Sequence, residues 1–298
     1  MTRQVTIASC AIVCANQPGS SSRQQLQAAA EALEEAGRRG ADIACLPEYA
    51  CAPIKVGARE ALSLSRQDLA PFTDLAAKHR MYVIAPFVEA SPERDGKPYN
   101  SAAVIDRQGQ IIGRYRKTHL CLPGFEEGEQ YAAGDELPVF DTDFGRIGIA
   151  ICMDIHYPEL FTTMALRGAE IIFWPTAAMD YTGDLIESLV NARAIDNQVF
   201  VVPSHYVAVP YLSGRHYGRS RVVDPMGRIR ADTGHFPGVA VANVDLEQTY
   251  PMWYQGQMLE AYPDMRRTLF KTRRPELYGD LVQPVSPGHW TRPREANG

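Results

Sequence analysis

Apolar residues along the chain follow two alternating patterns, short β-type runs and longer segments with helical spacing. Strand-like runs cover residues 5–14, 42–49, 81–88, 145–152, 170–175, 199–203 and 238–244. Helical spacing covers residues 24–38, 67–79, 159–167 and 185–197. The first of these helical segments ends before Gly40, a residue type that commonly stops helices. The alternation predicts repeated strand–helix–strand units.

Two further segments predict β-hairpins. In residues 101–116 the runs SAAVID and IIGRYR flank a turn at 107–109, and in residues 220–231 SRVVD and RIRA flank a turn at 225–227. Parallel βα units combined with hairpins indicate an α/β protein with mixed sheets. The two halves share this order and no linker separates them, so we expect a single domain over residues 1–298 with sheet stacked on sheet and helices outside. The segment 248–298, rich in Pro, Arg and Tyr, is predicted to be extended.

Composition narrows the class of protein. The 298 residues are 45% apolar and 22% charged, as in ordinary globular enzymes. The net charge of −5 disfavours nucleic acid, because phosphate binding needs a basic surface. The apolar N-terminal run is interrupted by Ser9 and followed by a polar helical stretch, so it is interpreted as a buried first strand and not as a signal peptide. No run reaches the roughly 18 apolar residues of a membrane helix. We therefore expect a cytoplasmic protein with no membrane or nucleic-acid partner.

The cysteines predict neither disulfides nor a metal site. They are Cys10, Cys14, Cys45, Cys51, Cys121 and Cys152. A large chain without a secretory signal does not need a disulfide framework. The sequence has no CxxC pair, and the two N-terminal cysteines have no matching histidine cluster, so we expect no metal and no cofactor. Small buried apolar residues are the plainest interpretation of most of these cysteines.

Three segments carry residues suited to catalysis. An apolar strand ends at Cys152 just before a helix, where a turn exposes a thiol and backbone N–H groups can hold an oxyanion. Glu48 ends another apolar strand, and Lys117 follows a hairpin strand. Taken singly, each has a plainer interpretation as a core cysteine, a surface glutamate or an exposed lysine. Together they supply the nucleophile, the acid–base group and the cation that amide cleavage requires.

The motifs that contain these residues resemble the nitrilase superfamily of carbon–nitrogen hydrolases. They are LPEY at 46–49, YRKTHL at 115–120 and GIAICMDIHYPEL at 148–160, with supporting stretches WPTA at 174–177, ARAIDNQ at 192–198 and GRSRVVDPMGRI at 218–229. The resemblance covers about residues 5–246. It implies a four-layer α-β-β-α sandwich with two mixed β-sheets, a homodimer or higher homo-oligomer, and a triad of Glu48, Lys117 and Cys152.

The resemblance also implies a second active-site glutamate in the loop GFEEGEQYAAGD. Three glutamates compete there, and the spacing back from Gly134 favours Glu127 over Glu126 and Glu129. For the dimer, it implies contacts through outward helices and the tail. In that arrangement the tail arginines would serve contacts between subunits; they are Arg266, Arg267, Arg273 and Arg274.

The residues after the cysteine bear on the substrate. Met153-Asp154 resembles amidase-like branches, whereas nitrilases usually have Trp-Glu there. Substrate contacts are expected from Tyr49, His119, Met153, Asp154, His156, Thr176 and Ala177. For His119 a structural role is the alternative, and for His156 capping of the next helix. A Tyr- and Pro-rich loop with His205 and His216 is expected to form part of the substrate wall.

We therefore expect an amidase or N-carbamoyl amidohydrolase that acts on a small amide or ureido compound. A nitrilase, a Cys–His hydrolase using His156 or His119, and a non-catalytic binding protein on the same scaffold are the alternatives.

Overall fold

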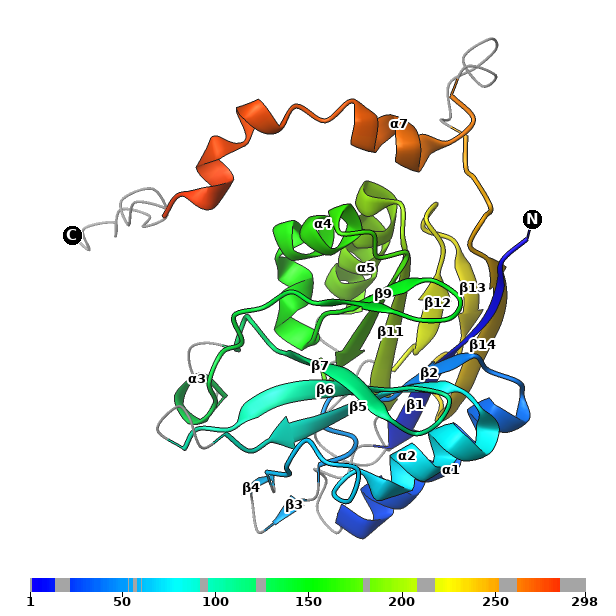
Figure 1. Ribbon diagram of the computed structural model, residues 1–298, viewed down its shortest axis with the longest axis vertical. Helices are drawn as coiled ribbons and strands as arrows, with labels where there is room; N and C mark the ends of the chain where they lie inside the picture. The colour runs from blue at the N-terminus through cyan, green and yellow to red at the C-terminus, as the bar shows by residue number, and fades with distance from the viewer. Residues whose placement is uncertain are drawn as a thin grey trace, which may run out of the picture. The chain divides into compact units, whose positions relative to one another are not determined.

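The computed structural model describes residues 2–13, 22–52, 54–55, 58–59, 61–91, 96–121, 127–178, 183–207, 218–251 and 262–284 (Figure 1). The chain divides into two compact units, Met1–Tyr250 and Pro251–Gly298. Each unit is described by itself.

The first unit contains two mixed sheets with the same internal plan. In spatial order, the first sheet consists of β7 (Ile111–Arg116), β6 (Tyr99–Ile105), β5 (Tyr82–Glu89), β2 (Ile43–Cys45), β1 (Gln4–Val13) and β14 (Gly238–Asp245). The second consists of β8 (Val139–Asp141), β9 (Arg146–Ile149), β10 (Ile171–Thr176), β11 (Phe200–Val207), β12 (Arg221–Val223) and β13 (Ile229–Asp232). In each sheet three neighbouring parallel strands are flanked by antiparallel ones. The sheets join where the ends of β1 and β11 pair in parallel.

Alternation along the strands builds the core. Side chains of one parity, such as Ile7 of β1 and Ile149 of β9, form a buried cluster between the two sheets. Side chains of the other parity on β1, such as Cys10, pack with the helices outside the first sheet. Because successive strand residues point to opposite faces, each inner strand is apolar on both sides.

Helices cover the outer faces. They are α1 (Ser22–Arg38) and α2 (Ala70–His79) on the first sheet, and α4 (Pro158–Leu166) and α5 (Gly183–Asn197) on the second, as Figure 1 shows. The predicted four-layer α-β-β-α sandwich with two mixed sheets is confirmed. A small separate hairpin, β3 (Ile54–Lys55) with β4 (Ala58–Arg59), was not predicted.

One difference from the predicted elements positions the site. The strand expected over residues 42–49 stops at Cys45, and residues 46–52 form turns, in which Ala50 N–H donates to Pro47 O. The side-chain amide of Gln25, on α1, donates to the backbone oxygens of Tyr49 and Ala50. The early end of β2 therefore places Glu48 in a turn that a buried glutamine holds in shape.

The second unit contains short helical elements in the tail for which the sequence predicts an extended chain. Its described residues contain helix α7 (Met265–Lys271) and two 3-10 turns, Pro275–Leu277 and Gly279–Val282. The carboxylate of Asp264 caps α7 by accepting the N–H of Arg267 at 3.0 Å. A local cap and a run of helix-forming residues outweigh the Pro-rich composition around them. Among the described residues, no helix is long and apolar enough to cross a membrane.

Candidate active site

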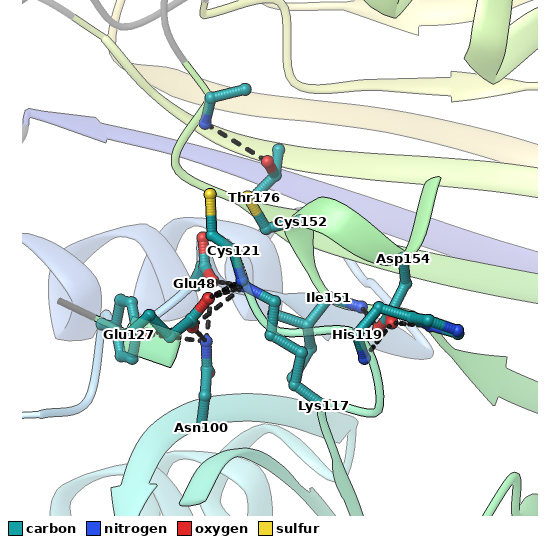
Figure 2. A network of polar contacts seen from close by, with 12 residues as sticks. Glu48, Asn100, Lys117, His119, Cys121, Glu127, Ile151, Cys152, Asp154 and Thr176 are labelled. Carbon is teal, nitrogen blue, oxygen red and sulfur yellow. Dashed lines mark hydrogen bonds and ion pairs between the residues drawn. The ribbon is translucent and has the colours of Figure 1, made fainter. Parts of the chain in front are cut away.

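The site lies where several strands end. β2, β9 and β10 lead into Glu48, Cys152 and Thr176, and β7 leads into Lys117. The turn after β2 is tied to the second sheet, because the hydroxyl of Tyr206 on β11 donates to the backbone oxygen of Glu48 at 2.7 Å. Figure 2 shows the residues from both sheets in one network.

Lys117 is the centre of an ionic cluster. Its Nζ donates to Glu48 Oε1 at 3.1 Å and to both carboxylate oxygens of Glu127 at 2.9 and 2.8 Å. Lys117 is 1% exposed and Glu48 2% exposed. Burial alone would lower the pKa of Lys117, but the negative charges of Glu48 and Glu127 outweigh burial and raise it well above its usual value. The side chain is therefore an ammonium ion at neutral pH.

Glu127 is the glutamate that the loop supplies. It begins the short helix α3 (Glu127–Gln130), whereas Glu129 on the same helix is exposed and Glu126 lies outside the described residues. Burial raises the pKa of Glu127, but the charge and hydrogen bonds of Lys117, with help from Tyr49 and the Cys121 N–H, give a net lowering. Of the two described glutamates, Glu127 is the one that contacts Lys117.

The spacing argument has a steric basis at Gly134. Its N–H donates to Lys117 O at 2.8 Å, and a Cβ at this position would lie 2.4 Å from Arg116 O. Only glycine allows the returning loop to approach the backbone beside Lys117 so closely.

Asn100 was not predicted, although it connects the two glutamates. Its Nδ2 lies 2.8 Å from Glu48 Oε1, Glu127 Oε1 and the Tyr49 hydroxyl, and Tyr49 donates in turn to Glu127 Oε1 at 2.6 Å. Asn100 lies on β6, and its backbone oxygen accepts the N–H of Lys117. The signal in the sequence was a polar residue at the start of the buried run preceding the hairpin turn. Tyr49, predicted as a substrate contact, bonds to Glu127 and Asn100 in this cluster.

Cys152 occupies a strained turn. It follows β9 and opens the 3-10 turn η1 (Cys152–His156) with a φ of 45°, and Tyr49 beside Glu48 has a φ of 62°. Residues other than glycine rarely adopt this left-handed conformation, and such strain concentrates at functional sites. Trp174 Nε1 donates to the backbone oxygen of Cys152 at 2.9 Å and anchors the turn to β10.

The thiol of Cys152 is protonated at rest. Burial, followed by the negative charge of Glu48, raises the pKa of the thiol to about 12, against the opposing effects of the Lys117 ammonium and a hydrogen bond with Thr176. The charges of Glu48, Lys117 and Glu127 all act on the sulfur, so the thiol and the ionic cluster form one electrostatic unit. Thr176, predicted near the substrate, contacts the thiol, and Ala177 follows it at the end of β10.

Asp154 lies apart from this cluster. It is 0% exposed, and both its oxygens accept hydrogen bonds from within the protein. His119 Nδ1 lies 2.9 Å from Asp154 Oδ1, and the ring stacks on Tyr157 at 3.6 Å between centroids. Asp154 does not occupy the position expected of a substrate contact, because the fold turns its carboxylate inward to cap the turn that carries Cys152.

The other residues predicted to contact the substrate differ in their exposure to solvent. Met153 is partly exposed and His156 is exposed. Burial and the charge of Arg193 lower the pKa of His156, so it is neutral at pH 7. Tyr157 occupies the N-cap position of α4 without a side-chain capping bond, and a substrate contact through His156 stays a prediction. His205 is buried on β11, and His216 lies outside the described residues.

The other thiols differ from one another in their exposure to solvent. Cys10, Cys45 and Cys51 are buried, Cys121 is partly exposed, and Cys14 lies outside the described residues. Across the described ranges, no three or more His, Cys, Asp or Glu side chains are grouped so as to hold a metal ion.

Comparisons with known proteins identify the family. A family model described as carbon-nitrogen hydrolase matches residues 7–254. Deaminated glutathione amidase from Bos taurus is 34% identical over 278 residues, which cover 88% of this chain and 81% of that protein. Omega-amidase NIT2 from Bos taurus is 33% identical over 235 residues, covering 76% and 84%. The structure of Saccharomyces cerevisiae Nit3, a member of branch 10 of the nitrilase superfamily, superimposes with a TM-score of 0.73 at 27% identity over 91% of this chain and 96% of that chain.

The fold and these matches define a protein of the nitrilase superfamily. Within it, the chain belongs to the carbon–nitrogen hydrolase family.

Proposed function

We propose that this hydrolase cleaves the C–N bond of a small non-peptide amide or N-carbamoyl amine through a thioester on Cys152. The observation that carries the proposal is the buried Lys117 ammonium held between Glu48 and Glu127, in electrostatic contact with the Cys152 thiol. A thiol with a pKa of about 12 is a poor nucleophile at neutral pH, so the reaction needs a base next to it.

Glu48 is the base in this proposal. Its carboxylate takes the thiol proton as sulfur attacks the carbonyl carbon, and the Lys117 ammonium stabilises the oxyanion that forms. Collapse of the tetrahedral intermediate breaks the C–N bond, and the leaving amine or ammonia takes the proton from Glu48. Water then attacks the thioester and gives a proton to Glu48. The acid departs, and the thiolate regains the proton.

Glu127 has a different role from Glu48. It accepts from Lys117 through both oxygens and also from Tyr49 and the Cys121 N–H, so its hydrogen-bonding capacity is largely used. Among the residues that the structure describes, the Glu48 side chain accepts hydrogen bonds from Lys117 and Asn100, both through Oε1. A carboxylate with fewer fixed donors is better able to bind a proton, which supports Glu48 as base and Glu127 as the holder of Lys117.

The chemistry of the substrate is inferred from relatives and from the turn after Cys152. Two relatives are named as amidases, and the Met153-Asp154 pair also resembles amidase-like branches. The Cys–His alternative finds less support, because Nδ1 of His119 faces Asp154 and its ring is stacked on Tyr157.

A screen for ammonia release over amides, ureido compounds and nitriles tests the function. The wild-type protein should release ammonia from at least one amide or ureido compound, and Cys152→Ala should release none while remaining folded. Cys121→Ser is the matched control, because this second, partly exposed thiol lies near the same ammonium and should be dispensable. Activity on nitriles alone would favour a nitrilase. Activity retained in Cys152→Ala would refute the mechanism.

The assembly and location stay predictions. We infer a homodimer that uses the outward helices, supported by exposed apolar side chains on α4 and α5, namely Leu166, Leu185 and Ile195. The contribution of the 248–298 tail and a cytoplasmic location rest on the sequence. Light scattering at micromolar concentration should give the mass of a dimer or larger assembly, and a monomer would contradict this inference.

A further inference from the structure

The carboxylate of Asp154 collects hydrogen bonds from two separate parts of the site. Oδ2 accepts the N–H of Ile151 and the hydroxyl of Tyr115, both at 2.7 Å. Oδ1 accepts the His119 N–H at 3.1 Å and the Thr118 hydroxyl at 3.2 Å. His119 Nδ1 lies 2.9 Å from the same oxygen and must be the donor, because a carboxylate oxygen can only accept.

These donors come from two segments of the chain, one beside Lys117 and one beside Cys152. Tyr115, Thr118 and His119 all lie within two residues of Lys117, at the end of β7. Ile151 directly precedes Cys152, and the Asp154 N–H returns a hydrogen bond to Ile151 O at 3.0 Å, which closes the turn. One carboxylate therefore joins the segment that carries the ammonium to the turn that carries the thiol, as Figure 2 shows for Ile151, Asp154 and His119.

A carboxylate is suited to the position between these two segments because both of them supply hydrogen-bond donors. A fully buried carboxylate is costly unless donors surround it, and hydrogen bonds to a charged acceptor are short and directional. Asp154 therefore favours one placement of these donors over others. A placement error of about 1 Å between a catalytic group and its target can cost on the order of a hundredfold in rate.

We infer that Asp154 is a positioning residue that fixes Lys117 relative to Cys152, and so places the ammonium where the oxyanion forms. The carboxylate of Asp154 is fully buried and bonded to protein donors, so we assign it no direct part in the reaction. The inference rests on the proposed function, since it assigns Lys117 to the oxyanion.

A double-mutant cycle between Asp154 and Lys117 tests this inference. The probe is p-nitrophenyl acetate, which acylates a reactive thiol and releases nitrophenol in a burst. Asp154→Asn should lower the burst rate constant about 10- to 100-fold, within the limit set by loss of Lys117 itself, about 100- to 1000-fold. If Asp154 acts through Lys117, then Asp154→Asn should change the rate less than threefold in a Lys117→Ala background.

Asp224→Asn controls for general loss of stability. Asp224 is also a fully buried carboxylate in a turn, where it accepts the N–H groups of Met226 and Arg228 in the β12–β13 hairpin. This variant should lower the melting temperature but keep the burst rate within twofold. Tyr115→Phe is a second variant, which removes the 2.7 Å bond to Asp154 together with the contacts of the same hydroxyl with Thr118, and retains the aromatic ring. It should slow the burst about three- to tenfold, again only when Lys117 is present.

The outcomes separate the two proposals. No burst with the wild-type protein, together with no ammonia release from any compound in the screen, would refute the proposed function. A normal wild-type burst that is unchanged in Asp154→Asn, or in Tyr115→Phe should the first variant not fold, would overturn only the positioning role. The positioning role would also be overturned if Asp154→Asn slowed the burst by the same factor in the Lys117→Ala background as in the wild-type protein. That result would show that Asp154 acts independently of Lys117.

Discussion

Two buried carboxylates, Glu48 and Asp154, lie on opposite sides of Lys117 and differ in what surrounds them. Glu48 faces an ammonium ion, an amide and, across the cluster, a second carboxylate. Asp154 faces hydroxyls, backbone N–H groups and one imidazole, which together satisfy both oxygens. In our proposal the fully satisfied carboxylate maintains geometry, whereas the one among charges serves as the acid–base group. Burial alone does not distinguish the two roles, but the set of donors does.

Among the tests of this contrast, replacement of Glu48 by glutamine should change the rate of acylation most. Glutamine has nearly the same shape but cannot take the thiol proton, and general base catalysis contributes typically about 100- to 10,000-fold. Glu48→Gln should therefore lower the acylation rate by about 1000-fold or more with a nearly unchanged fold. Rapid-quench kinetics on the substrate found by the screen measures this. Acylation at a near-normal rate would exclude Glu48 as the base.

Loss of the cation should have the next largest effect. Lys117→Ala should slow acylation about 100- to 1000-fold, because the oxyanion loses its stabiliser. Lys117→Arg should not restore the rate, since a planar guanidinium does not fit the site of a compact ammonium buried between Glu48 and Glu127. The same quench assay applies, and full rescue by arginine would show that only the positive charge matters.

Glu127→Gln should lower the rate of acylation less than Glu48→Gln does. The amide can still accept from Lys117 but carries no charge, so we expect a loss of about 10- to 100-fold, expressed in the rate of acylation. Single-turnover kinetics on both variants compares them directly. If Glu127→Gln abolishes both half-reactions while Glu48→Gln leaves them intact, the two carboxylates have been assigned the wrong way round.

The lowered pKa of Glu127 predicts a pH effect on stability. Its folded pKa lies below the unfolded value, so the ionised carboxylate stabilises the fold above the unfolded pKa of about 4.5, and this contribution is lost as pH falls through the folded pKa. Melting temperatures of the wild-type protein and Glu127→Gln should differ more at pH 7 than at pH 3. An equal difference at both values would show that the ionised form contributes no stability.

His156→Ala should have the smallest effect. The exposed, neutral imidazole lies next to the Cys152 turn but caps no helix. If it contacts substrate, KM should rise up to about fivefold with little change in kcat, as expected for a binding contact made equally in the ground and transition states. An unchanged KM for every accepted substrate would leave His156 without a role in binding.

Several parts of the site could be predicted because the sequence marks strand ends. Glu48 and Cys152 each end an apolar run, and parallel strands gather their carboxyl ends at one edge, whereas Lys117 follows a hairpin strand. The structure brings these residues together with Glu127. The sandwich followed from the repeated order of strands, helices and hairpins, which both sheets share.

Other features depend on contacts far apart in the sequence. Asn100 meets Glu48 and Glu127 only after β6 has been placed beside β7, so no local spacing signals its role. Asp154 is two residues from Cys152 and was predicted to contact substrate, but three of its donor residues lie more than thirty residues away at the end of β7, namely Tyr115, Thr118 and His119. In the tail, the cap at Asp264 creates a helix that overall composition does not reveal.

The central claim is that Cys152 carries the acyl group during turnover, and acid quench followed by peptide mass spectrometry tests it most directly. Protein mixed with the substrate found by the screen and quenched within one turnover should show the mass of the acyl group on the peptide containing Cys152. The same experiment on Cys152→Ala should show no acyl mass and no product. An acyl group on another residue, or continued product release from Cys152→Ala, would contradict the account.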